Sequence, residues 1–204
     1  MTISEHEAFD AAVGRMILTW AEMEGCLYSV FVHYSGMSDP VARAVLSGTR
    51  ASGLISYLEA IFANKNIDPP GKLRSAIEQT RSINAMRDWI AHNGSRSIVT
   101  YKDDTVSVRV TSNAERVARY AKTKELAVSV QMLEDMVHDL EWICACYQEI
   151  FLTPVLGEME IDGERLLQPV ELPPWRYKSP SPERNSPRWD YQQPTTSPPD
   201  AKAE

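Results

Sequence analysis

The sequence lacks several features that would assign it to a common class of protein. It has no uninterrupted apolar run of the about 18 to 20 residues that a membrane-spanning helix needs. Its opening residues, MTISEHEAFD, are polar and acidic, without the basic and then apolar layout of a secretory signal. We therefore expect a cytoplasmic protein with no membrane partner.

Cysteine is scarce, and motifs for nucleotides or common catalytic nucleophiles are missing. The three cysteines, Cys26, Cys144 and Cys146, form an odd set without the spacing of zinc ligands, so we expect reduced thiols and no metal. There is no P-loop, no Rossmann glycine loop and no nucleophile elbow. We expect neither a metal nor an organic cofactor.

Positive charge is also in short supply. The chain has 21 Lys and Arg against 28 Asp and Glu, for a net charge of −7. A protein that coats nucleic acid would instead have a basic surface and a high pI. The charge balance argues against that class, but it does not exclude a local phosphate site built from a few residues.

Proline divides the chain into two parts, because ten of the thirteen prolines lie from Pro154 onward. We expect a folded domain at residues 1–152 and a Pro/Ser-rich tail at 153–204 that is disordered or extended, since it has few aliphatic residues to bury. The tail also contains aromatic residues that can dock on a partner or back on the domain, namely Trp175, Tyr177, Trp189 and Tyr191.

Apolar residues at three- and four-residue steps predict the helices of the domain. The first helix begins at a capping box of Ser4 and Glu7 and ends at Gly36. A short helix capped by Asp39 follows. The face of the first helix that we expect to be buried comprises Phe9, Val13, Met16, Ile17, Trp20, Leu27 and Phe31.

Three more helices are predicted at about 51–63, 72–92 and 129–151, the last of them capped by Ser129. Between the last two, SIVTY and TVSVRV are rich in β-branched residues and predict a short hairpin. The expected fold is an all-α, four-helix bundle with a short extra helix and a small β-hairpin insert.

Two charged residues fall on apolar helix faces. At 100° per residue, Glu24 lies close to the line through the apolar residues of the first helix. Arg87 lies near the centre of an arc made of Leu73, Ala76, Ile77, Ile83, Ile90 and Ala91. A buried charge is costly without a partner, so an ion pair between Glu24 and Arg87 is one explanation for both residues.

A phosphate site is the second explanation for Arg87. A guanidinium binds phosphate through two hydrogen bonds, and a nearby histidine can move protons. Asp88 and His92 are four residues apart, so they are neighbours on one helix face, where Asp88 can fix the imidazole tautomer. The two explanations are compatible, because Glu24 can orient Arg87.

The motif RDWIAH, from Arg87 to His92, resembles the signature of HEPN domains, in which an arginine and a polar residue precede a histidine near the end of an inner bundle helix. The order of helices over about residues 5–152 is similar to that family as well. The resemblance implies a metal-independent endoribonuclease of a toxin, phage-defence or RNA-processing system. It also implies a homodimer, with an RNA cleft between the two motifs.

The resemblance implies roles for individual residues. His92 would act as general base or acid at the ribose 2′-OH, Arg87 would hold the scissile phosphate, and Asp88 would orient one of them. Internal attack by the 2′-OH would leave a 2′,3′-cyclic phosphate and a 5′-OH without a metal. Further contacts to RNA would come from Asn93, Arg96 and Arg81, with Lys102 as an additional candidate.

A function of another class remains open. The chain can be a non-catalytic helical dimerisation or binding module in which Arg87 forms a structural ion pair with Glu24. In the nuclease interpretation, an antitoxin or another partner protein would also bind the chain. The two functions predict different surroundings for Arg87, either a sealed core or an open cleft.

Overall fold

The structure is a computed structural model that describes residues 5–93, 95–100, 106–111, 125–157, 159–161, 164–165 and 167–179. The side chains of residues 92–127 lie outside this description. The described ranges contain five helices: α1 (Glu5–Ser35), α2 (Asp39–Leu46), α3 (Ala51–Lys65), α4 (Gly71–Asn93) and α5 (Val130–Leu156). The chain is therefore mostly helical, as the sequence predicts.

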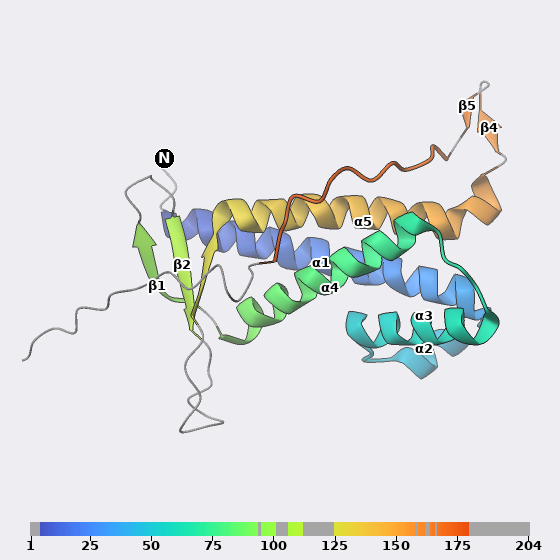
Figure 1. Cartoon of the computed structure of the whole chain (residues 1–204), viewed down its shortest axis with the longest axis horizontal. Coiled ribbons are helices and arrows are strands. Elements are labelled where there is room, and N and C mark those ends of the chain that lie inside the picture. The colour runs from blue at the N-terminus through green and yellow to red at the C-terminus, as the bar shows by residue number, and fades with distance from the viewer. Residues whose placement is uncertain are drawn as a thin grey trace, which may run out of the picture.

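Strands occur at the two ends of the bundle (Figure 1). β1 (Ser95–Thr100) and β2 (Val106–Thr111) pair antiparallel and correspond to the expected hairpin. β3 (Glu125–Ser129), which the sequence analysis does not predict, pairs antiparallel with the other side of β2 and leads directly into α5. At the opposite end, the short strands β4 (Glu160–Ile161) and β5 (Glu164–Arg165) pair with each other.

The ends of the helices follow the local signals in the sequence with two exceptions. α1 ends before Gly36, which has a φ of +74°, and the Ser129 hydroxyl accepts the Met132 N–H at 3.1 Å at the start of α5. Ser38, and not Asp39, occupies the N-cap of α2. α5 continues through Pro154 to Leu156, beyond the expected end. Ser4 of the expected capping box lies outside the described residues.

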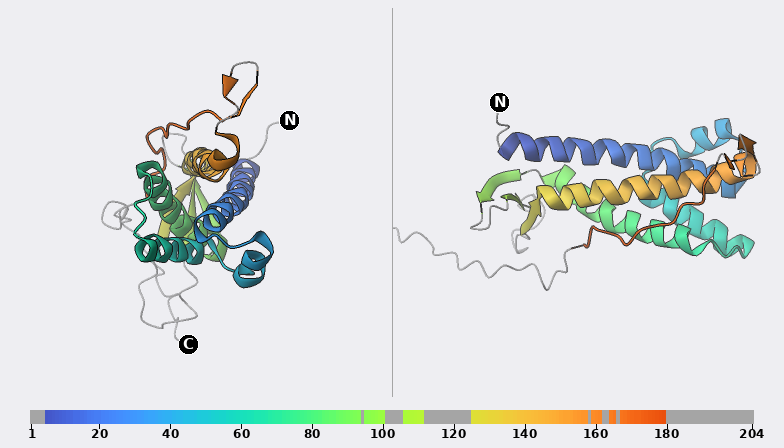
Figure 2. Two further views of the ribbon diagram at one scale, coloured as in Figure 1. Left: turned by 90° about the vertical axis from the view of Figure 1, so that its right-hand side faces the viewer. Right: turned by 90° about the horizontal axis from the view of Figure 1, so that it is seen from above.

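The long helices α1 and α5 run parallel and side by side (Figures 1 and 2). Arg15 pairs with Glu134 at 3.2 Å, and Cys26 lies against Gln148 further along both helices. α4 runs antiparallel to α5, because Lys72 near the start of α4 pairs with Glu149 near the end of α5. Seen end-on in Figure 2, α1, α3, α4 and α5 surround one centre and α2 lies outside them.

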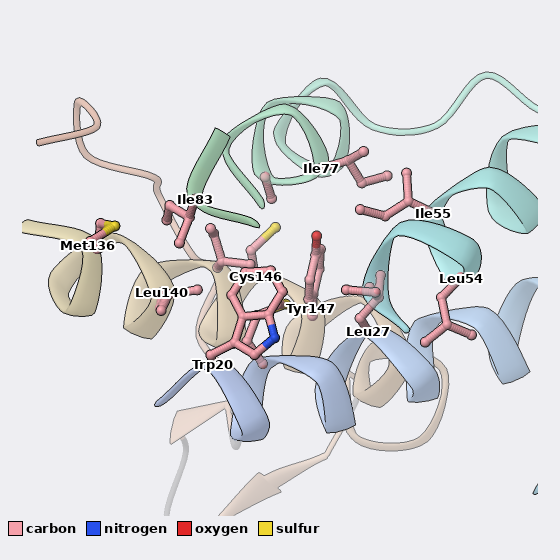
Figure 3. Packing of buried hydrophobic residues seen from close by; sticks show 14 of the residues in the cluster. Trp20, Leu27, Leu54, Ile55, Ile77, Ile83, Met136, Leu140, Cys146 and Tyr147 are labelled. Carbon is pink, nitrogen blue, oxygen red and sulfur yellow. The ribbon is translucent and has the colours of Figure 1, made fainter. Parts of the chain in front are cut away.

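The core fills the space between these four helices. In Figure 3, Trp20 and Leu27 of α1 lie next to Leu140 and Tyr147 of α5, with side chains of α3 and α4 above them. Tyr147 is fully buried, and its hydroxyl lies 2.9 Å from the hydroxyl of Thr80 on α4. This hydrogen bond satisfies two polar groups inside a largely apolar core.

Two residues of the expected apolar faces are not in the core. Ile17 is 37% exposed, and Ala91 is exposed near the end of α4. The buried face of α1 runs instead through Met16, Trp20, Met23, Leu27 and Val30, a regular alternation of three- and four-residue steps. Since α5 covers a narrow strip along α1, Ile17 lies just outside it.

Part of the expected tail packs against the bundle. Residues 167–179, here called the C-terminal strap, contain no helix or strand and run back from the end of α5 along α4 and α5 (Figures 1 and 2). Tyr177 is only 2% exposed, and Trp175 is half-buried. Residues 180–204, including Trp189 and Tyr191, lie outside the described residues.

No helix in the described part of the chain is both long and apolar enough to cross a membrane.

Leu140 provides a test of the core. It is fully buried between α1 and α4, so Leu140→Ala should lower the free energy of unfolding by about 2–5 kcal/mol, from lost apolar contact and the cavity left behind. Val155, which is 69% exposed on the same helix, is the control, and Val155→Ala should change stability by less than about 0.5 kcal/mol. Urea unfolding followed by circular dichroism measures both; equal effects would contradict the packing described.

Candidate functional site

Arg87 lies in the last two turns of α4, beside the first half of α1. Its guanidinium carbon lies 5.3 Å from the centre of the Trp20 ring, over the face of a fully buried indole. Its Nη1 donates to Asp88 Oδ1 at 2.6 Å, and 21% of the side chain remains exposed. The cation is therefore held by a ring and a carboxylate, with part of it open to solvent.

Asp88 is tied into α4 by two donors. Oδ1 accepts from Arg87, and Oδ2 accepts from Asn84 Nδ2 at 3.3 Å, one turn earlier. The Nε–H of Arg87 is buried and has no hydrogen-bond partner among the described residues. A guanidinium that is fixed by Asp88 and partly exposed is suited to binding an oxyanion.

Arg87 lies at the edge of the buried face of α4 and not at its centre. On a helical wheel with Leu73 at 0°, the buried residues of the first half of α4 cover the arc from about 240° through 0° to about 40°. In the second half, Ile83, Met86 and Ile90 cover only about 220° to 280°. The buried face therefore narrows and shifts along the helix. Arg87, at about 320°, falls beside its second half, and this explains the partial exposure. Ala91, at the angle of Leu73, is exposed for the same reason.

Glu24 has a different partner from the expected one. Its carboxylate accepts the backbone N–H of Ala51 at 3.2 Å, at the start of α3, where the N-cap residue Arg50 makes no side-chain cap. A carboxylate at a helix N-terminus satisfies an orphan donor and interacts favourably with the helix dipole. In the described part of the chain Arg87 pairs with Asp88, so the expected Glu24–Arg87 ion pair is not formed.

The other expected site residues are only partly placed. His92 and Asn93 are the last two residues of α4, and Arg96 belongs to β1, but their side chains lie outside the described residues. Lys102 lies outside them altogether. Arg81 is half-exposed two turns before Arg87 and pairs with Glu59 of α3 at 2.5 Å.

Two further residues, Trp20 and Asp139, have roles that the sequence analysis does not predict. Trp20 supports Arg87 from α1, a tertiary contact that no spacing along α4 reveals. Asp139 is a charged residue that is fully buried in α5. Its angle on the helical wheel, about 40° from Ile143, already places it within the apolar arc. A charged residue within an apolar arc is thus a signal for Asp139 as it is for Arg87 and Glu24.

The cysteines are all free, and two of them lie close together. Cys26 of α1 and Cys144 of α5 are half-buried, whereas Cys146 is buried in the core. A hydrogen bond from Cys144 lowers the pKa of Cys26 to about 7, with Gln148 as a second donor at 3.7 Å. Burial raises the pKa of Cys146 to about 11. Among the described residues, no three His, Cys, Asp or Glu side chains lie together as metal ligands would.

Comparisons with protein-family models, curated proteins and solved structures find no match to this chain. Statements about its function therefore depend on the residues themselves: the RDWIAH motif and the surroundings of Arg87.

A double-mutant cycle tests the partners of Glu24 and Arg87. Glu24→Ala should lower the free energy of unfolding by about 1 kcal/mol through loss of the α3 cap. Because Glu24 bonds Ala51 and Arg87 pairs with Asp88, the effects of Glu24→Ala and Arg87→Ala should add within about 0.5 kcal/mol. Glu22→Ala, at an exposed site of α1, is the matched control. A larger coupling energy would show that Glu24 and Arg87 interact after all, and would contradict the partners described here.

Thiol chemistry tests the setting of Cys26. Because only the thiolate reacts, alkylation of Cys26 by iodoacetamide should rise with pH and reach half its maximal rate near the pKa of about 7. Cys144→Ala removes the main donor and should move this midpoint toward the ordinary cysteine pKa of about 8.5. Cys146→Ala should leave it unchanged. Peptide mass mapping identifies the modified residue, and a midpoint that ignores Cys144 would contradict the hydrogen bond.

Proposed function

We propose that this protein is a metal-independent endoribonuclease of the HEPN type, a cytoplasmic toxin or phage-defence effector that acts as a homodimer. The observation that carries the proposal is the setting of Arg87. A guanidinium fixed by Asp88 and by the face of Trp20, yet partly exposed, is suited to holding a phosphate. His92 follows in the same helix, one turn after Asp88.

In the proposed reaction the ribose 2′-oxygen attacks the adjacent phosphorus. His92 accepts the proton of the 2′-OH or supplies one to the leaving 5′-oxygen, and the equivalent residue of the second copy performs the other transfer. The bond from phosphorus to the 5′-oxygen breaks, leaving a 2′,3′-cyclic phosphate and a 5′-OH. Arg87 stabilises the charge that builds on the phosphoryl oxygens.

Asp88 acts in this proposal as a positioning residue. It already holds Arg87, and Asn84 holds its second oxygen, so the guanidinium stays in one orientation without paying further entropy on binding. The nucleophile belongs to the RNA itself, which gives the reaction its specificity for RNA over DNA. The acidic chain then binds a short local stretch of RNA through Arg87 and neighbours such as Arg81, Asn93 and Arg96.

The alternative function, a non-catalytic helical dimerisation or binding module, depended on burying Arg87 in an ion pair with Glu24. Glu24 is occupied at the start of α3, and part of Arg87 is exposed. This arrangement favours the nuclease proposal over the binding module.

Cleavage of labelled single-stranded RNA in EDTA tests the proposal. The wild-type chain should produce fragments ending in 2′,3′-cyclic phosphate, His92→Ala should lower the rate by about 10²–10⁴-fold, and Arg87→Ala by about 10²–10³-fold. His33→Ala and Arg43→Ala, at exposed sites of α1 and α2, are matched controls that should retain full activity.

Circular dichroism must first show that each variant keeps the wild-type helical content. An inactive wild-type chain, or cleavage that persists in His92→Ala, would point to the binding module instead. Activity lost on addition of EDTA would contradict the metal-independent mechanism.

A further inference from the structure

The C-terminal strap runs along α4 and α5 (Figures 1 and 2) and bonds side chains of both helices; the surface that it covers is here called the groove. Val170 lies near Glu149 and Tyr177 near Asp139, so the strap runs antiparallel to α5. The indole N–H of Trp175 donates to Ser75 Oγ at 2.9 Å, and the contacts with α4 advance in the same direction as the strap. The groove is thus occupied by an extended segment of the same chain.

Side chains of the bundle hold the backbone of the strap. The fully buried carboxylate of Asp139 accepts the N–H of Arg176 at 3.0 Å and the N–H of Tyr177 at 2.9 Å. Gln79 Nε2 donates to Asp139 at 2.8 Å and to the carbonyl of Tyr177 at 2.9 Å. Both polar groups of one peptide residue are therefore recognised, as they would be by a neighbouring strand.

The side chains of the strap alternate between the groove and solvent. Tyr177 is buried and Trp175 half-buried, whereas Arg176 and Lys178 are exposed. Further along, Glu149 accepts the N–H of Val170 at 3.0 Å. Backbone hydrogen bonds combined with pockets for alternate side chains are the recognition mode of proteins that bind extended peptides.

The strap has the properties of a ligand more than of a structural element. It forms no helix or strand of its own, and its prolines at 169, 173 and 174 favour an extended conformation before binding. Along the chain, the segment that contains β4 and β5 connects it to the end of α5. An empty groove would leave the buried Asp139 without two of its three donors, so the groove is stabilised by any chain that supplies them.

We propose that the groove between α4 and α5 is a peptide-binding site for an extended Pro-Pro-Trp-x-Tyr segment, and that the strap of a second copy of this chain can replace the chain's own. A second copy carries the same sequence, so an exchanged strap makes every contact seen within one chain. The inference does not depend on the nuclease proposal, because none of its contacts involves Arg87 or His92.

Binding of a labelled peptide with the sequence of residues 167–179 tests the site in the full-length chain. Trp175→Ala/Tyr177→Ala weakens the chain's own strap, so this variant should bind the peptide at least about tenfold more tightly than wild type, whose strap competes at high effective concentration. A peptide carrying the same two alanines should bind neither chain.

The Trp175→Ala/Tyr177→Ala chain is here called the opened variant. Adding Asp139→Asn to it should weaken peptide binding at least about tenfold, because the amide lacks the second acceptor oxygen. Asp135→Asn, one turn earlier on α5 and bonded to Gln131, is the matched control and should leave binding unchanged. Failure of a folded, opened variant to bind the peptide, or equal binding after Asp139→Asn, would overturn the proposal.

Hydrogen exchange of the wild-type chain tests exchangeability even if the opened variant fails to fold. The amides of Arg176 and Tyr177 should exchange faster than the core amide of Leu140, and excess strap peptide should accelerate them further by occupying the groove. Amides of Arg176 and Tyr177 that exchange only with global unfolding, at the rate of Leu140, would make the strap a fixed part of the fold and refute the proposal.

Discussion

Parallel packing of α1 against α5 is the constraint on which the rest of the architecture depends. Because the two helices begin at the same end of the bundle, the chain between them must leave that end and return to it. α4 runs antiparallel to α5 and brings the chain back to that end, where it enters the sheet that leads into α5. The end of α4 thereby comes to lie beside the first half of α1, where Arg87 meets Trp20.

The helices could be predicted from the sequence because their signals are local. The three- and four-residue steps, Gly36 after α1 and Ser129 before α5 each act within a few residues. The partners of Glu24 and Arg87 could not be predicted in this way. A helical wheel gives the angle of a residue around its own helix, but not which neighbouring helix covers each turn. Asp88 is the next residue after Arg87, so their contact could be predicted from the sequence. The contact between Arg87 and Trp20 could not, because it depends on the packing of α4 against α1.

α4 joins the two sites of the molecule. Gln79 and Thr80 are buried polar residues that face the strap and Tyr147, and Arg87 follows about two turns later, roughly 12 Å along the same helix. The first half of α4 can carry polar groups inward because Asp139, Tyr147 and the strap satisfy them. The described part of the strap bonds Ser75 and Gln79 in the first half, and Arg87 in the second half is partly exposed. A single helix therefore presents a backbone-binding surface and a cationic one.

The pairing of α1 with α5 also sets the order in which the chain can mature on the ribosome. The contact between Arg15 and Glu134 spans 119 positions, so the apolar face of α1 has no α5 to cover it until most of the chain has been made. At about 5–20 residues per second, Met16, Trp20 and Leu27 remain uncovered by α5 on the order of ten seconds. Until then the apolar face of α1 is open to contact with other proteins, and a chaperone that shields apolar helices would bind a chain in this condition.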